Sequence, residues 1–229
     1  MLKKHSRLIL EPLLLFMVFF LPSYLGGGRD LPPLGSDATF AMLSSIVAGI
    51  PQLLLMLYLV SLQTETPSET WGLIPLRRQD ILFIAFVSVS SVALTIPLVA
   101  LASNLPPGYR WSLQEPIQIP LAICFGLATG YREEFFFRSY LFARATQAGF
   151  PGWISILLSS ALFGLGHAYE GILGIAAATV LGVLYSIVYF RRPSLHVVAI
   201  SHGLYNSAAL CFSLMASHGL PSAYTIGIL

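Results

Sequence analysis

Long apolar runs dominate this chain and restrict its fold more than any other feature. Of its 229 residues, 56% are hydrophobic and only 10% are charged, whereas a soluble domain carries about 25% charged residues. This number of polar residues is too small to cover the surface of a protein in water. Most of the surface must therefore face lipid. One membrane span needs about 20 mainly apolar residues. The sequence therefore predicts a single transmembrane domain over residues 1–229, with no sizeable soluble part.

Seven apolar runs are separated by segments rich in Gly and Pro, which are loop signals. In hydrocarbon the backbone must satisfy its own hydrogen bonds, so runs of this length form helices. They lack the alternation over about ten residues that is typical of membrane β-barrel strands. We therefore expect an all-α, polytopic bundle of about seven to eight helices. The runs are Leu8–Leu25, Ala41–Leu62, Ile81–Ala102, Ile117–Thr129, Trp153–Ala168, Ile172–Phe190 and Leu195–Ser217.

Between the fourth and fifth runs, the segment Tyr131–Phe150 mixes aromatic residues with charges. Its pattern is helical. It either continues the fourth span as far as the interface or lies in the plane of the membrane, and the sequence does not decide between these.

The positive charges predict the orientation, because cytoplasmic loops are enriched in Lys and Arg. With the N-terminus in the cytoplasm, only Arg29 and Arg110 lie outside. The first run has no small-residue cleavage site and is expected to stay as an uncleaved span. We therefore expect seven spans, with the N-terminus inside and the C-terminus outside. The inside residues are Lys3, Lys4, Arg7, Arg77, Arg78, Arg132, Arg138, Arg144, Arg191 and Arg192.

Glu133, Glu134 and Arg138 form the first of three polar groups in apolar sequence. Glu134 and Arg138 are four residues apart and share a helix face, which predicts a structural ion pair. Glu133 is rotated by about 100° from Glu134, so it is not the natural partner of Arg138. Apolar surroundings disfavour the charged form of a carboxylate and make it a stronger base. The alternative is a solvated interfacial helix with an ordinary charge pair.

The second polar group is His167, which follows Gly164 and Gly166 near the end of the fifth run. The glycines allow close helix packing. His167 is either a satisfied side chain at a helix end or a proton carrier, hydrogen-bond donor or metal ligand.

The third group is His202 and Asn206, one helical turn apart in the seventh run. Two donors directed at one point can stabilise a developing oxyanion. A polar helix–helix contact is the alternative.

The remaining polar and thiol groups are expected to be peripheral or structural. Glu11 is expected near the headgroups and Glu170 in a solvated loop, while Cys124 and Cys211 fit small buried thiols. The other three histidines are expected at the interface: His5, His196 and His218.

Taken together, the three groups resemble the signature of the CPBP intramembrane proteases, also called the CAAX protease and bacteriocin-processing or Abi family, which includes type II CAAX prenyl endopeptidases. That signature is Glu-Glu-x-x-x-Arg, then Phe-x-x-x-His, then His-x-x-x-Asn/Asp. Here it reads Glu133-Glu134…Arg138, Phe163…His167 and His202…Asn206. The likeness covers roughly Ile117–Ser213, the expected catalytic motif core, and implies a helical core with a polar cavity open toward the cytoplasm.

The resemblance also implies roles for these side chains. Glu133 would be the general base, with His167 helping to position and deprotonate water. His202 and Asn206 would hold the oxyanion, while Glu134 would orient the site and pair with Arg138. No cofactor is implied, and the partners would be the lipid bilayer and a membrane-bound or lipidated peptide.

Three alternatives stay open at this point. Glu133, His167 and His202 are a ligand set that zinc peptidases use, although no His-Glu-x-x-His is present. A non-catalytic immunity or scaffold protein would keep the polar core for packing only. A transporter would use Glu133 and His167 as an ion relay, but the chain has no internal repeat. The formal net charge of +2 gives no reason to expect nucleic acid.

Overall fold

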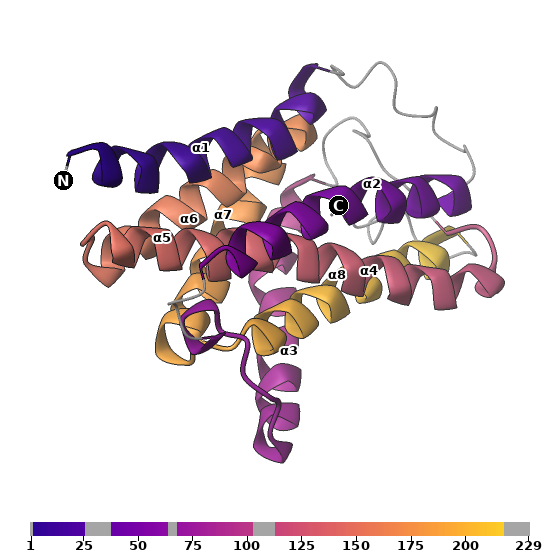
Figure 1. The fold of residues 1–229 in the computed structure, drawn as a ribbon. Coiled ribbons are helices and arrows are strands. Elements are labelled where there is room, and N and C mark those ends of the chain that lie inside the picture. The colour runs from indigo at the N-terminus through magenta and orange to yellow at the C-terminus, as the bar shows by residue number, and fades with distance from the viewer. Residues whose placement is uncertain (1, 26–37, 64–67, 103–112, 218–229) are drawn as a thin grey trace.

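The structure is a computed structural model that describes residues 2–25, 38–63, 68–102 and 113–217. This part of the chain is mostly helical and contains no strand, so the predicted all-α bundle is confirmed (Figure 1). Three residues whose position in the membrane was predicted lie outside the described residues: Arg29, Arg110 and His218.

Every predicted apolar run forms a helix. The run at Leu195–Ser217 coincides with a helix of the same bounds, and the others agree at most ends to within a few residues. The helices are α1 (Leu2–Leu25), α2 (Ala38–Ser61), α3 (Arg78–Ala102), α4 (Ile119–Glu134), α6 (Gly152–Gly166), α7 (Gly171–Arg191) and α8 (Leu195–Ser217). Short 3-10 turns precede α3, α4 and α7: η1 (Ser68–Trp71), η2 (Pro116–Gln118) and η4 (Ala168–Glu170).

Four helical segments in the described part are long and apolar enough to cross a membrane: Ala38–Ser61, Arg78–Leu98, Ala168–Arg191 and Leu195–Phe212. α6 is apolar as well but has only 15 residues. The number of seven spans and the side of the membrane on which each end lies stay predictions.

Most of the segment Tyr131–Phe150 continues the fourth helix, and its place relative to the membrane stays a prediction. α4 passes without a break into a π-helix, η3 (Phe135–Tyr140), and then into α5 (Leu141–Gln147). Gly149, with φ of +80°, follows the end of α5, as glycine does after many helices. A π-turn inside an α-helix often marks a functional site, and this one begins directly after Glu134.

α4 and α8 pack backbone against backbone, and they lie side by side in Figure 1. The glycines at their contact make this possible, because a Cβ at Gly130 would lie 2.4 Å from the carbonyl oxygen of Ala199, and one at Gly126 would lie 2.6 Å from that of Gly203. The close approach places the end of α4, which carries the two glutamates, beside the stretch of α8 that carries His202.

α6 and α7 form a second close pair. A Cβ at Gly164 would lie 3.1 Å from the carbonyl oxygen of Ile175, and one at Gly182 would lie 3.0 Å from the Cα of Ser160. The predicted packing role of Gly164 is therefore confirmed. Gly166 lies instead against Phe20 of α1, whose ring carbon Cδ1 would be 3.3 Å from an added Cβ.

An aromatic cluster joins α1 to the middle of the long helix. Phe136 and Phe137 are fully buried. The ring of Phe20 lies 4.9 Å from that of Phe137, and the ring of Phe19 lies 5.9 Å from that of Phe136. α1 is thereby packed over the π-helix that follows the glutamates.

One prediction for an acidic residue is wrong. Glu170 is half-buried with its Oε1 fully covered, not solvated in a loop. Glu11 accepts hydrogen bonds from Tyr140 and from the buried Arg144, whose Nη2 lies 2.5 Å from Oε1. Its expected place near the headgroups stays a prediction.

The cysteine prediction is also wrong. Cys124 is exposed and Cys211 is only half-buried. Apolar side chains on a membrane helix can face outward as well as inward, so an apolar run does not by itself bury a thiol.

Candidate active site

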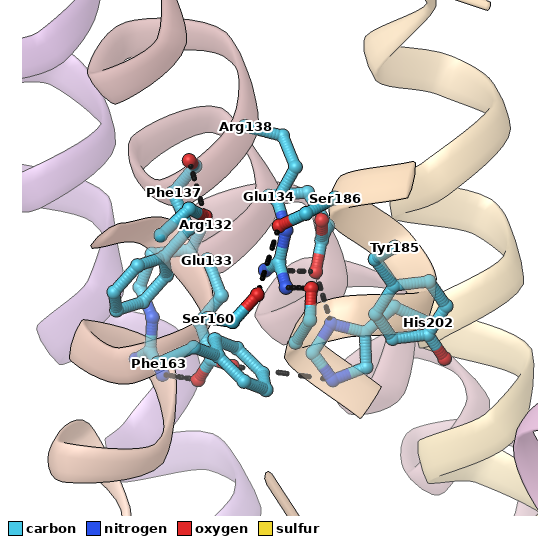
Figure 2. Close-up of polar contacts among 12 residues, drawn as sticks. Arg132, Glu133, Glu134, Phe137, Arg138, Ser160, Phe163, Tyr185, Ser186 and His202 are labelled. Carbon is cyan, nitrogen blue, oxygen red and sulfur yellow. Dashed lines mark hydrogen bonds and ion pairs between the residues drawn. The ribbon is translucent and has the colours of Figure 1, made fainter. Parts of the chain in front are cut away.

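Glu134 is the fully buried centre of the polar cluster drawn in Figure 2. Its Oε1 lies 2.9 Å from Nη1 of Arg138 and 2.8 Å from Nδ1 of His202. The two side chains that spacing predicted to pair are therefore in contact. Since an ionised carboxylate only accepts hydrogen bonds, the Nδ1–H of His202 donates to Glu134, and the ring presents Nε2 on its other side.

Arg138 has no exposed surface and is held from three sides. Besides Glu134, it donates from Nη2 to the carbonyl oxygen of Gly182 at 3.1 Å. Its guanidinium carbon lies 4.5 Å from the centre of the Phe163 ring, within the range of a cation–π contact. Arg138 thus joins the π-helix to α6 and α7, which matches the structural role that its spacing suggested.

Glu133 is 6% exposed and points to a different partner from Glu134. Its Oε1 lies 3.0 Å from Nη2 of Arg132. Its Oε2 is buried, has no hydrogen-bond partner among the described residues, and lies 4.0 Å from Nε2 of His202. The spacing argument correctly separated Glu133 from Arg138, but it did not foresee Arg132.

His167 lies at the end of α6, where its Nδ1 is 2.8 Å from the carbonyl oxygen of Phe163. A carbonyl accepts, so Nδ1–H donates and Nε2 is left on the outer side of the ring. The Phe163 ring lies between the two histidines, 4.7 Å from the ring of His167 and 5.6 Å from that of His202.

Asn206 lies one turn after His202 on α8 and is 2% exposed. Its Nδ2 is buried and has no hydrogen-bond partner among the described residues. A buried amide without a partner costs about 1–3 kcal/mol, so this donor is suited to a group that arrives from outside the fold.

The family comparison adds an independent finding. A model of the Rce1-like family, described as type II CAAX prenyl endopeptidase Rce1-like, matches residues 115–208. Residues 115–208 form an Rce1-like domain. The predicted resemblance to the CAAX proteases is therefore confirmed for this stretch, which runs from just before η2 into α8 and contains every residue of the cluster above. Comparison with curated proteins and with solved structures gave no match.

Because this family consists of proteases, the match supports an endopeptidase. Together with the four membrane-length helices of the described part, it makes the chain an integral membrane protein.

Two residues of the Rce1-like domain were missed by sequence reasoning. Tyr185 stacks on His202, with ring centres 5.1 Å apart, and its hydroxyl lies 2.9 Å from the Oγ of Ser91. Arg132 had been counted only as a loop charge. No local pattern distinguishes either residue, since the position of each depends on a neighbouring helix.

The sequence offered one candidate set of ligands for a metal ion. Among the residues that the structure describes, no three His, Cys, Asp or Glu side chains gather into a group that could hold a metal ion. Glu133, His167 and His202, the set considered from the sequence, are therefore not assembled as a three-ligand site in this geometry.

Proposed function

We propose that the chain is an intramembrane endopeptidase of the glutamate type, which cleaves a membrane-bound or lipidated peptide. The observation that carries this proposal is the arrangement around Glu133. A buried carboxylate oxygen with no partner faces the Nε2 of a histidine whose other nitrogen is held by a second buried carboxylate. A polar cluster that served only helix packing would not need an unpaired carboxylate oxygen beside an unpaired imidazole nitrogen.

Glu133 acts as the general base. The 4.0 Å between its Oε2 and Nε2 of His202 is too long for a direct hydrogen bond, which leaves Oε2 available to accept a proton from water. His167 assists from the end of α6 by holding the same water. General base catalysis of this kind contributes typically 10²–10⁴-fold to a rate.

His202 and Asn206 stabilise the oxyanion of the tetrahedral intermediate. Asn206 offers its unpartnered Nδ2. Since Nδ1–H of His202 already donates to Glu134, Nε2 can donate only when the ring is doubly protonated. Oε2 of Glu133 lies 4.0 Å from Nε2 on one side of the ring, and Oε1 of Glu134 lies 2.8 Å from Nδ1 on the other. Glu134 therefore orients His202, and Arg138 holds Glu134.

The family description, type II CAAX prenyl endopeptidase Rce1-like, supports one substrate class in particular. We propose a prenylated peptide with a C-terminal Cys-aliphatic-aliphatic-X sequence as the first substrate to test. Residues 117–213 form the catalytic core, and its polar cavity opens to the cytoplasm, on the side where the N-terminus lies.

The test uses the full chain in nanodiscs and an internally quenched, farnesylated CAAX peptide. Glu133→Gln removes the base and keeps the size of the side chain, so cleavage should fall to background while thermal unfolding is unchanged. Glu69→Gln is the matched control, because Glu69 is exposed in η1. Cleavage by Glu133→Gln at the wild-type rate would refute the assignment. Cleavage abolished by a chelator and restored by zinc would favour a metal mechanism instead.

A further inference from the structure

Arg132 reaches its neighbour Glu133 in an unusual way. Consecutive residues on a helix point about 100° apart and do not ordinarily face each other. Nevertheless Nη2 of Arg132 lies 3.0 Å from Oε1 of Glu133, and Figure 2 shows the two side chains meeting beside the cluster. The arginine side chain must therefore be directed sideways across the surface of α4.

The surface that directs it is α2, at the buried residue Gly49. A Cβ at Gly49 would lie 3.2 Å from Cδ and 3.4 Å from Nη1 of Arg132, and the three atoms nearest to it all belong to that arginine. Because Gly49 has no side chain, the side chain of Arg132 can lie close against α2 at this point. The side chain of Arg132 is 23% exposed, against 7% for Glu133, so the guanidinium closes the outer side of the carboxylate.

This contact fixes the orientation of the carboxylate. Oε1 is tied to Arg132, so Oε2 is turned toward Nε2 of His202 and has no partner of its own. Arg138, the other nearby arginine, is committed to Glu134 and Gly182 and does not set this orientation.

We propose that Arg132, seated on Gly49, is the positioning residue of the general base. It holds Glu133 so that one oxygen is anchored and the other is presented to water and to His202. The inference rests on the proposed function, since it assigns a role within that reaction. It makes α2 part of the catalytic apparatus although α2 contributes no polar group to the cluster.

Four variants test it with the same farnesylated, quenched CAAX peptide. Arg132→Ala should lower kcat by about 100-fold, the cost of misplacing a reacting group by about 1 Å, with KM within about twofold of wild type. Arg132→Lys keeps one charged donor and should recover part of kcat. Gly49→Ala should lower kcat by a smaller factor. Arg191→Ala, an arginine exposed at the end of α7, is the control and should cleave normally.

The double variant Gly49→Ala/Arg132→Ala separates positioning from packing. If Gly49 acts through Arg132, the double variant has the kcat of Arg132→Ala alone, because coupled residues are not additive. Four results would each overturn the inference. They are additive losses of kcat in the double variant, an unchanged kcat in Arg132→Ala, a change confined to KM, and equal losses of kcat in Arg132→Lys and Arg132→Ala. Failure of the proposed function itself would look different: the wild type would not cleave the peptide, or Glu133→Gln would cleave it normally.

Discussion

Adding one methyl group at Gly130 should misalign the site from a distance. A Cβ there would lie 2.4 Å from the carbonyl oxygen of Ala199 and 2.8 Å from the amide nitrogen of Gly203. Both are backbone atoms of α8 and cannot rotate away. To reach favourable contact at about 3.5 Å, α4 and α8 must separate by roughly 1 Å at this point, three residues before Glu133.

Two measurable effects follow from that separation. Overpacking of a well-packed contact costs about 1–3 kcal/mol, which for a chain of this size lowers Tm by roughly 2–12 °C. The same shift moves the two glutamates relative to His202, whose Nδ1 now lies 2.8 Å from Glu134. A displacement of about 1 Å can cost about 100-fold in rate, so kcat should fall by much more than the loss of folded protein explains.

The assay compares Gly130→Ala with Gly166→Ala in nanodiscs, with thermal unfolding and peptide cleavage measured on the same samples. At Gly166 the nearest atom to an added Cβ is a ring carbon of Phe20 at 3.3 Å, and a side chain can adjust, so Tm should change little. If Gly130→Ala unfolds and cleaves as the wild type does, the argument that backbone contact between α4 and α8 sets the site is refuted.

Two further predictions concern single polar contacts. Arg144→Met leaves Glu11 with the exposed Arg7 as its remaining cation and should lower the free energy of unfolding by about 3 kcal/mol, measured by denaturant unfolding in detergent. Glu11→Gln/Arg144→Met should recover part of the loss, and no recovery would show that the pair is not the cause. Asn206→Ala removes one of the two proposed oxyanion donors and should lower kcat by about 10²–10³-fold with KM and Tm little changed, whereas a loss confined to KM would assign Asn206 to substrate binding.

The sequence predicted the helices well because a membrane imposes a length and a composition on each one. Ile172–Phe190 was expected and Gly171–Arg191 was found, since the limits of the apolar run are also the limits of the helix. It predicted the pair of Glu134 and Arg138 for a similar reason, because the spacing of four residues survives the change from α- to π-helix between them. Both inferences depend only on local periodicity.

Contacts that depend on another helix were beyond this reasoning. Glu11 and Arg144 are 133 positions apart in sequence, and nothing near Glu11 indicates a buried partner. The direction of Arg132 is determined by the absence of a side chain at Gly49 on α2. The continuation of α4 into η3 and α5 was also open, since charges between aromatic residues fit a long buried helix and an interfacial one equally well.

Residues without side chains determine where the reactive ones lie in this fold. Gly130 and Gly203 set the distance between the glutamates of α4 and His202 of α8. Gly182 presents its carbonyl oxygen to Arg138, and Gly49 leaves the space for Arg132. A soluble enzyme can hold such groups with the hydrophobic effect, but in lipid close packing must supply the attraction between helices. The catalytic geometry should therefore be more sensitive to small increases in volume at these glycines than to loss of apolar volume on the lipid-facing sides of the same helices.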